Sequence, residues 1–243
     1  MNFDRVVALL KGIDADLVCL QEVKIESTLH YTVPTLARAL SCDYVLSEAG
    51  TPLPGILARQ CDVVMAKKPL NLREGLDIKL VVKKKQERTL AAGTVTLNGT
   101  DVRVYCTHLD VGNESVRMQQ LEQILTHIDQ EVPHVLLGDF NALSRADYTD
   151  QQWEAIVSER AKNRWEPAKT AVYDKLMGLG YRDAFPGRDK VAPNQLSTVW
   201  ANIRIDWILL SRSNPAQITH YEVLSSDASD HFPVLIKFRI PAH

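Results

Sequence analysis

At residues 134–141 the chain reads HVLLGDFN, an apolar run that passes directly into polar side chains. The apolar part predicts a buried strand over 135–138, and Gly138 permits a close backbone approach or an unusual turn. In an extended segment, residues i and i+2 point to the same side, so Asp139 and Asn141 are expected to face one site. A turn with the asparagine as a cap is the alternative, but it leaves the paired spacing unexplained.

Acidic and imidazole groups flank apolar runs at several other points of the chain. Glu22 follows DLVCLQ, His108 follows VRVYCT, Asp206 opens DWILL, and Asp230 and His231 precede FPVLI. Packing alone gives no reason to place such groups at the ends of buried strands. Metal-assisted attack on a phosphate does, because it needs carboxylates for a divalent cation, a group that orients or deprotonates water, and donors for the developing charge.

Taken singly, most of these positions also have an ordinary structural interpretation. Glu22 fits a carboxylate that turns out to solvent at a strand end, and a lone histidine such as His108 is more often structural. The cluster at 229–231 could cap a helix, although extended sequence follows it. Asp206, however, begins a strongly apolar run, where a carboxylate needs a partner to offset its desolvation. His231 is the obvious partner, and the pair would fix the imidazole tautomer and raise its pKa.

The composition fits one soluble globular domain or a closely joined pair, because 45% of the 243 residues are hydrophobic and 24% are charged. The net charge of −2 gives no global basic field, which argues against tight non-specific binding of nucleic acid. A local basic patch at 83–85 or 67–68 would be enough for catalysis. A solvated surface run is the more usual interpretation of each.

The four cysteines lack metal-binding spacing and a disulfide framework, which favours a reducing compartment. The N-terminal residues lack the apolar core of a signal peptide, and no run approaches the roughly 18 apolar residues of a membrane span. We therefore expect a soluble intracellular monomer, in the cytoplasm or the nucleus, without a membrane span.

Apolar periodicity predicts helices over residues 2–13, 34–40 and 113–131, and two more within 150–180. Strands are predicted over 16–23, 44–46, 63–66, 78–83, 89–97, 102–107, 135–138, 203–210, 220–224 and 232–240. Asn98-Gly99 predicts a hairpin turn, and the prolines and glycines of 50–55 predict a loop. Interleaved helices and hairpins indicate one α/β domain with packed sheets.

In this order the motifs resemble those of the endonuclease/exonuclease/phosphatase superfamily, which has the DNase I-like fold. The matching segments are DADLVCLQEV, RVYCTHLD, VLLGDFNAL, RIDWILLS and SDHFPVLIKF, and they span residues 14–239. The segment QERTLAAGTV at 86–95 is similar to a family strand whose arginine lies near the substrate phosphate, which makes Arg88 a candidate for substrate binding. The resemblance implies an α/β (α+β) fold, a four-layer αββα sandwich of two packed, mainly antiparallel sheets, with the site where the sheet edges meet.

The same resemblance implies roles for the carboxylates and the amide. Glu22 would be a ligand of Mg²⁺, with Mn²⁺ as the alternative ion, and Asp230 would lie close to the metal. Asp139 would orient or activate the attacking water, and Asn141 would hold that water or the phosphate.

The resemblance also implies roles for the two histidines. His231, paired with Asp206, would donate to the phosphate or transfer a proton. His108 matches the second histidine of DNase-like and sphingomyelinase-like members. Apurinic-site endonucleases typically carry tyrosine at that place, so this chain differs from that branch.

The N-terminus departs from the family pattern. Family members begin with a strand that carries a Trp-Asn or similar pair, whereas this chain starts with Met1-Asn2-Phe3-Asp4 inside the helix that should follow. We therefore expect a single domain over 1–243 that is short at its N-terminus by a strand of roughly five residues. Its absence would leave neighbouring strands with unpaired backbone groups.

These expectations lead to a Mg²⁺-dependent phosphoesterase that hydrolyses a phosphodiester or a phosphomonoester by in-line attack of water. Its substrate would be nucleic acid, as for a nuclease, or a small phosphodiester, a nucleotide, a phosphoinositide or a phospholipid headgroup. A catalytically impaired relative that acts as a binding module is the alternative from another class. Substrate choice in this fold depends on loops, which lie here at 47–60, 67–77 and 142–170.

Overall fold

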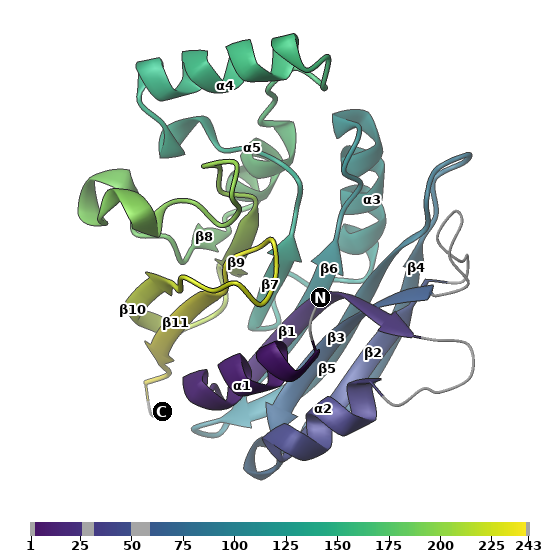
Figure 1. Cartoon of the computed structure of the whole chain (residues 1–243). Helices are drawn as coiled ribbons and strands as arrows, with labels where there is room; N and C mark the ends of the chain where they lie inside the picture. Colours follow the sequence, from purple (N-terminus) through teal and green to yellow (C-terminus); the bar gives the residue numbers. More distant parts are fainter. Residues whose placement is uncertain (1–2, 26–31, 50–58, 242–243) are drawn as a thin grey trace.

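Helices are interspersed among the strands along the chain, and together they build a layered structure (Figure 1). The structure is a computed structural model and describes residues 3–25, 32–49 and 59–241. The helices are α1 (Phe3–Ile13), α2 (Thr32–Leu40), α3 (Glu114–Thr126), α4 (Asp150–Lys162) and α5 (Ala171–Gly178). The strands are β1 (Leu17–Ile25), β2 (Cys42–Glu48), β3 (Arg59–Lys67), β4 (Arg73–Leu80), β5 (Arg88–Leu97), β6 (Thr100–His108), β7 (His134–Asp139), β8 (Arg182–Asp183), β9 (Asp206–Leu210), β10 (Gln217–Val223) and β11 (Val234–Arg239). Short 3₁₀ helices lie at Lys68–Leu70, Arg145–Asp147, Arg188–Lys190 and Pro193–Gln195.

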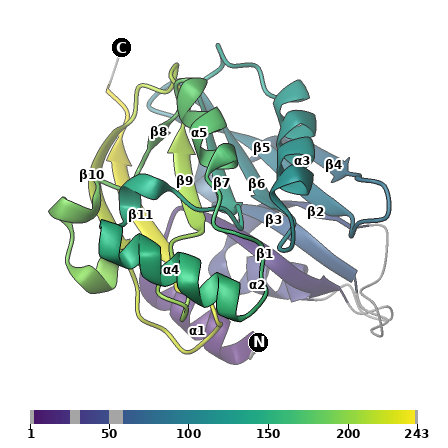
Figure 2. The ribbon, with the colours of Figure 1, turned by 90° about the horizontal axis from the view of Figure 1, so that it is seen from above.

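The strands form two main sheets that pack against each other. The larger sheet has the order β4-β5-β6-β7-β9-β8, and the smaller has the order β1-β3-β2. All paired strands of the described chain are antiparallel except β6 and β7, which confirms the mainly antiparallel character expected from the sequence. Seen from above, α3 and α5 lie on the side of the larger sheet that faces away from α1 and α2 (Figure 2).

Alternation along the strands explains how the layers hold together. Val63 and Met65 of β3 pack in the cluster that contains α1 and α2, whereas Val64 and Ala66 pack between the two sheets. A third cluster lies between the larger sheet and helices α3 and α5. The four-layer arrangement predicted from the sequence is therefore confirmed.

Two strands and one edge lie outside this main pairing. Strands β10 and β11 pair with each other and, within the described chain, join neither sheet. Strand β1 is an edge strand of the smaller sheet.

No helix of the described residues is long and apolar enough to cross a membrane.

Several element bounds differ from the sequence prediction. Helix α3 ends at Thr126 rather than near residue 131, because the His127 amide closes the last turn and the Asp129 side chain then accepts the amide of Glu131 in a separate turn. Strand β9 spans only Asp206–Leu210, whereas the predicted strand began at residue 203. Strand β4 stops at Leu80 instead of continuing to residue 83.

The hairpin predicted at Asn98-Gly99 is confirmed. Both residues have positive φ, 48° and 77°, and Leu97 pairs directly with Thr100. Positive φ at both central residues is the backbone of the tight turn that matches the twist of two antiparallel strands. The loop predicted at 50–55 lies outside the described residues.

Candidate active site

Three polar side chains form a row across the larger sheet. His108 of β6 pairs with Asp139 of β7, and Asp139 pairs with Asp206 of β9. Two residues further into their strands, Cys106 and Ile208 pack between the two sheets. Because alternate residues share a face, His108 and Asp206 face the same layer at the end of the sheet. Motifs that are far apart in the sequence therefore meet through the register of three adjacent strands.

Gly138 permits the close approach of β7 to β6 that this row requires. Its φ is 143°, a value that favours glycine. A Cβ atom at this position would lie 1.9 Å from the carbonyl oxygen of Thr107. The glycine immediately before Asp139 therefore has a steric function in bringing the two strands together.

A bulge in β1 turns Glu22 toward this row. The pairing of β1 with β3 shifts within residues 20–23, and Glu22 has a φ of 55°, which non-glycine residues rarely adopt. Gln21 donates to the Cys106 sulfur at 3.1 Å, while a carboxylate oxygen of Glu22 lies 3.6 Å from His108 Nδ1. In a regular strand these two consecutive side chains would face opposite sides of the sheet. The bulge thus directs the side chains of both Gln21 and Glu22 toward β6.

Arg88 and His108 form a buried pair. Arg88 Nη1 lies 3.1 Å from His108 Nδ1 and 4.0 Å from Glu22 Oε1. Arginine can only donate, so Nδ1 is the acceptor in this pair, while Nε2 lies 3.4 Å from Asp139 Oδ2. Burial lowers the pKa of His108, and the charges of Arg88 and His231 lower it further, so this ring is neutral.

The Nε–H of Arg88 is buried and has no hydrogen-bond partner among the described residues. Only 7% of Arg88 is exposed, so this donor also lacks full access to water. A buried guanidinium with an unused donor gains from an anion placed beside it.

Asn141 is tied to Asp139 through its backbone and its side chain. Its N–H donates to Asp139 Oδ1 at 2.8 Å, and its side-chain amide donates to the Leu109 carbonyl at 3.1 Å. The same amide nitrogen lies 3.0 Å from His108 Nε2. Asn141 has a φ of 49°, a conformation that asparagine tolerates better than most residues. Asp139, Asn141 and His108 therefore share one polar space.

The pKa of Asp139 is raised. Burial is the main cause, and the negative charge of Asp206 adds to it, while the positive charge of His231 opposes both. A carboxylate whose pKa is shifted toward neutrality is a stronger base than an ordinary aspartate.

Asp206 and His231 are in direct contact, as the sequence predicted. His231 Nδ1 lies 2.9 Å from Asp206 Oδ2, and the opposite ring nitrogen lies 3.9 Å from Asp139 Oδ2. Burial alone would lower the pKa of His231. The hydrogen bond to Asp206 and the charges of Asp206, Asp139 and Asp230 outweigh burial and raise the pKa to about 9. The ring is therefore protonated at neutral pH, with Nε2–H directed toward Asp139.

Asp206→Asn should lower the His231 pKa from about 9 toward the ordinary histidine value of ~6.5, because the imidazolium loses its anionic partner. If the protonated ring is the active form, the alkaline limb of kcat/KM moves to lower pH in this variant. NMR titration of the His231 ring in metal-free protein measures the pKa directly. A double-mutant cycle with His231→Ala provides the control: losses that multiply fully, or an unchanged titration curve, would show that the two side chains do not act as a pair.

Asp230 is exposed and lies beside this pair rather than within it. Its carboxylate accepts a hydrogen bond from Ser229 Oγ at 3.2 Å. Within the described chain, no hydrogen bond or ion pair joins Asp230 to Glu22, the other residue predicted to bind metal. The contacts of the described residues therefore do not bring the two predicted ligands together.

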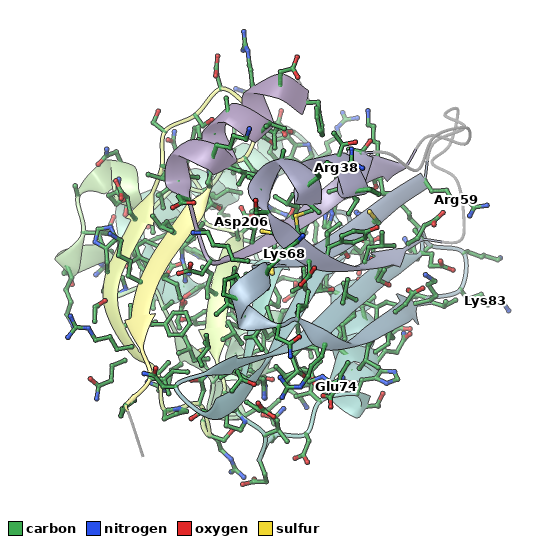
Figure 3. All side chains as sticks on the ribbon, turned by 90° about the horizontal axis from the view of Figure 1, so that it is seen from below. Arg38, Arg59, Lys68, Glu74, Lys83 and Asp206 are labelled. Atoms are coloured by element: carbon green, nitrogen blue, oxygen red, sulfur yellow. The ribbon has the colours of Figure 1, made fainter. Side chains whose placement is uncertain are left out.

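Lys67 and Lys83, one residue from each predicted basic run, lie away from this site (Figure 3). Lys67 contacts the carboxylates of Asp14 and Asp16 at the far end of β3. Lys83 lies at the margin of the molecule, whereas Asp206 lies near its middle (Figure 3). Among the described residues, Arg88 and His231 are cationic groups that contact the row.

Asp62 was not identified from the sequence. Only 3% of this residue is exposed, and its carboxylate accepts the Thr89 hydroxyl at 2.5 Å. Burial raises the pKa of Asp62 to about 8, and the hydrogen bond from Thr89 and the charge of Arg88 oppose the rise. The available signal was a carboxylate directly before the apolar run that begins at Val63. The predicted strand started at residue 63, four residues after the actual start of β3 at Arg59.

A family model decides the relationship of the chain. The model for the endonuclease/exonuclease/phosphatase family matches residues 1–231. The chain belongs to this family. A search of curated proteins found no match.

Solved structures agree with the family in fold. An endonuclease/exonuclease/phosphatase from Beutenbergia cavernae is 22% identical with a TM-score of 0.76, and the alignment covers 98% of this chain and 66% of that one. The human Nocturnin catalytic domain with bound sulfate is 17% identical, with a TM-score of 0.71 and coverage of 98% and 86%. A mannosyl-6-phosphatase from Bacteroides thetaiotaomicron is 18% identical, with a TM-score of 0.64 and coverage of 97% and 90%. At these identities the likeness shows the DNase I-like fold of the family, and the chain spans about two thirds of the Beutenbergia protein.

Proposed function

We propose that this chain is a divalent-metal-dependent phosphoesterase that hydrolyses a phosphodiester or a phosphomonoester. The observation that carries the proposal is the row of His108, Asp139 and Asp206, with Arg88 and His231 at its two ends. It places one basic carboxylate between groups that can donate to a phosphate. Members of the family are hydrolases that act on phosphoester bonds. The sulfate bound by human Nocturnin, an anion shaped like phosphate, gives further support.

Asp139 would accept the proton of the attacking water. Its Oδ2 faces the Nε2 atoms of His108 at 3.4 Å and of His231 at 3.9 Å, so a water molecule bound to it would lie near both rings. The raised pKa of Asp139 brings its basicity toward neutral pH, where a general base is most effective. Asn141 would orient the same water or a phosphoryl oxygen, because its amide borders the same space.

The negative charge that develops on the phosphoryl group would be balanced by fixed donors. Protonated His231 presents Nε2–H, and Arg88 has an unused Nε–H. His231 could also pass its proton to the leaving oxygen, since Asp206 holds the other ring nitrogen and stabilises the charged ring. Donors fixed before the reaction avoid the cost of reorganising water around the transition state.

The carboxylate of Glu22 fits a hard cation such as Mg²⁺. The side chain is 51% exposed, and its nearest described partners lie at 3.6 and 4.0 Å, so its oxygens are available. Mg²⁺ prefers oxygen ligands and keeps several waters, so the Glu22 carboxylate would hold it together with water molecules. When bound, the ion would neutralise charge on the phosphoryl oxygens.

A second acidic group fits Mg²⁺ less well. Ligand atoms of Asp139, Asp206 and His231 lie within 4.8 Å of one another. However, the Nδ1 atom of His231 is hydrogen-bonded to Asp206, and imidazole binds transition metals better than Mg²⁺. We therefore assign this group to proton transfer and Glu22 to the metal.

Glu22→Gln should weaken Mg²⁺ binding by roughly 10–100-fold or more, the range seen when even an outer-shell partner is lost. The fold should persist, because half of the Glu22 side chain is exposed. Isothermal titration with Mg²⁺ measures the change. Glu74→Gln is a matched control, since Glu74 is also an exposed glutamate with a φ of 55°. Equal Mg²⁺ affinity in wild type and Glu22→Gln would exclude Glu22 as a principal ligand.

The function itself is tested by a substrate panel with and without Mg²⁺ or Mn²⁺. The panel contains bis-p-nitrophenyl phosphate, p-nitrophenyl phosphate, a sugar phosphate, a single-stranded oligonucleotide and a phosphoinositide. We expect metal-dependent release of product from at least one of these and loss of that activity in Asp139→Asn. Metal binding without turnover of any substrate would instead favour a binding module.

A further inference from the structure

Asp62 crosses the space between the two sheets beside the proposed site. On β3, Val64 and Ala66 pack between the sheets, and alternation places Asp62 on the same face. Its carboxylate accepts the hydroxyl of Thr89 on β5 at 2.5 Å. This hydrogen bond therefore joins the smaller sheet, which carries Glu22, to the larger sheet, which carries Arg88.

Both ends of this bond lie next to residues of the site. The bulge in β1 at residues 21–22 lies directly opposite Asp62, because the residues on either side of the bulge pair with the neighbours of Asp62. Thr89 is the residue after Arg88 on β5. One small cavity is lined by Glu22, Asp62, Arg88, Thr89 and His108 together with four neighbours.

Other hydrogen bonds also cross between the sheets, from Gln21 to Cys106 and from Ser47 to Asp77, but neither involves Arg88 or Thr89. The side chains that fill the layer are mainly apolar, and apolar packing is non-directional. Among the described residues, the Arg88 side chain has one hydrogen bond, to His108, and its Nη1 lies 4.0 Å from Glu22 Oε1. A buried hydrogen bond, in contrast, constrains both distance and angle and is costly to break.

We propose that Asp62 is a positioning residue whose bond to Thr89 sets the Arg88 guanidinium and the Glu22 carboxylate at a fixed separation across the two sheets. The inference rests on the proposed function, since it assigns Arg88 to the phosphate and Glu22 to the metal. Asp62 itself acts through its hydrogen bond to Thr89 and through the bulge of β1 that lies opposite it. A misplacement of about 1 Å at a reacting centre can cost roughly 10²-fold in rate.

A second bond between the sheets provides a matched control. Ser47 of β2 is fully buried, and its hydroxyl donates to Asp77 of β4 at 2.5 Å. Ser47 pairs with Asp62 across β2 and β3, so the two bonds start from adjacent strands. Neither Ser47 nor Asp77 lines the cavity that contains Glu22.

The test compares Thr89→Val, Asp62→Asn and Ser47→Ala in the full chain. Thr89→Val removes the donor and keeps the shape, Asp62→Asn keeps an acceptor for Thr89, and Ser47→Ala removes the control bond. Each variant is titrated with inorganic phosphate, and the Arg88 Nε–H and His108 amide resonances are followed by NMR in metal-free protein. Activity is measured with the substrate that wild type hydrolyses.

Thr89→Val should shift both resonances, weaken phosphate binding and lower kcat/KM by roughly 10–10²-fold. Asp62→Asn should remain within about threefold of wild type, as should Ser47→Ala, because a bond to Thr89 persists in the first and the cavity is untouched in the second. Unchanged resonances and phosphate affinity in Thr89→Val would overturn the inference even if stability falls. Shifted resonances in a protein that hydrolyses nothing would support the positioning of Arg88 and count against the proposed function instead.

Discussion

We expect Asp139→Asn to lower kcat by about 10²–10⁴-fold, the usual contribution of a general base. The substitution keeps the size of the side chain. It also keeps an oxygen that can accept the backbone N–H of Asn141, which donates to Asp139 Oδ1 at 2.8 Å in the wild type. It removes the negative charge that would take the proton from water. Steady-state hydrolysis at saturating metal and substrate measures the loss.

Stability distinguishes this loss from unfolding. Burial and Asp206 raise the pKa of Asp139 above its ordinary value, so ionising this group above pH 4 opposes folding rather than favouring it. The neutral amide carries no such cost, and the melting temperature should be equal or higher at pH 7. A variant that keeps more than about a tenth of the wild-type rate would move the role of base to another residue.

Asn141→Ala should lower kcat by roughly 10²–10³-fold, the loss seen when one preorganised donor is removed from a transition state. The amide of Asn141 borders both His108 and Asp139, so a phosphoryl oxygen or a water placed there loses its donor. The rate of a single turnover with saturating substrate measures this effect on the chemical step.

Two further variants separate the amide from the backbone. Asn141 has a φ of 49°, where alanine is strained by about 1–2 kcal/mol. Asn141→Gly relieves that strain and still lacks the amide, so it should be as inactive as the alanine variant. Asn141→Asp keeps the preference for this backbone but offers an acceptor instead of a donor, and it should also be inactive. Recovery in Asn141→Gly would assign the role to the backbone.

The row of His108, Asp139 and Asp206 could be predicted from the sequence because its determinants are local. Each residue ends or begins an apolar run, and side chains alternate along a strand with a period of two. The order of the motifs indicated the fold through the family resemblance, whereas the pairing of these strands is seen only in the structure. The contact of Asp206 with His231 followed from the need of a carboxylate at an apolar strand for a partner.

Other features depend on tertiary context and gave no local signal. The bulge in β1 turns Glu22 toward the same face as Gln21, although consecutive residues of a regular strand face opposite sides. A bulge leaves no recognisable pattern in a single apolar run. The bond of Asp62 to Thr89 joins two sheets, so neither residue reveals it alone. The bounds of α3 and β4 were set by turns at Asp129 and after Leu80 that compete with the apolar periodicity.

The central claim is that water attacks phosphorus beside Asp139, and hydrolysis in ¹⁸O-labelled water tests it most directly. With bis-p-nitrophenyl phosphate and Mg²⁺, we expect one ¹⁸O atom in the phosphate product of each turnover and none in the p-nitrophenol. The Asp139→Asn variant should form labelled product at a rate lower by at least about 10²-fold. Label in the p-nitrophenol, a phosphate product without label, or equal rates in the two proteins would contradict the account.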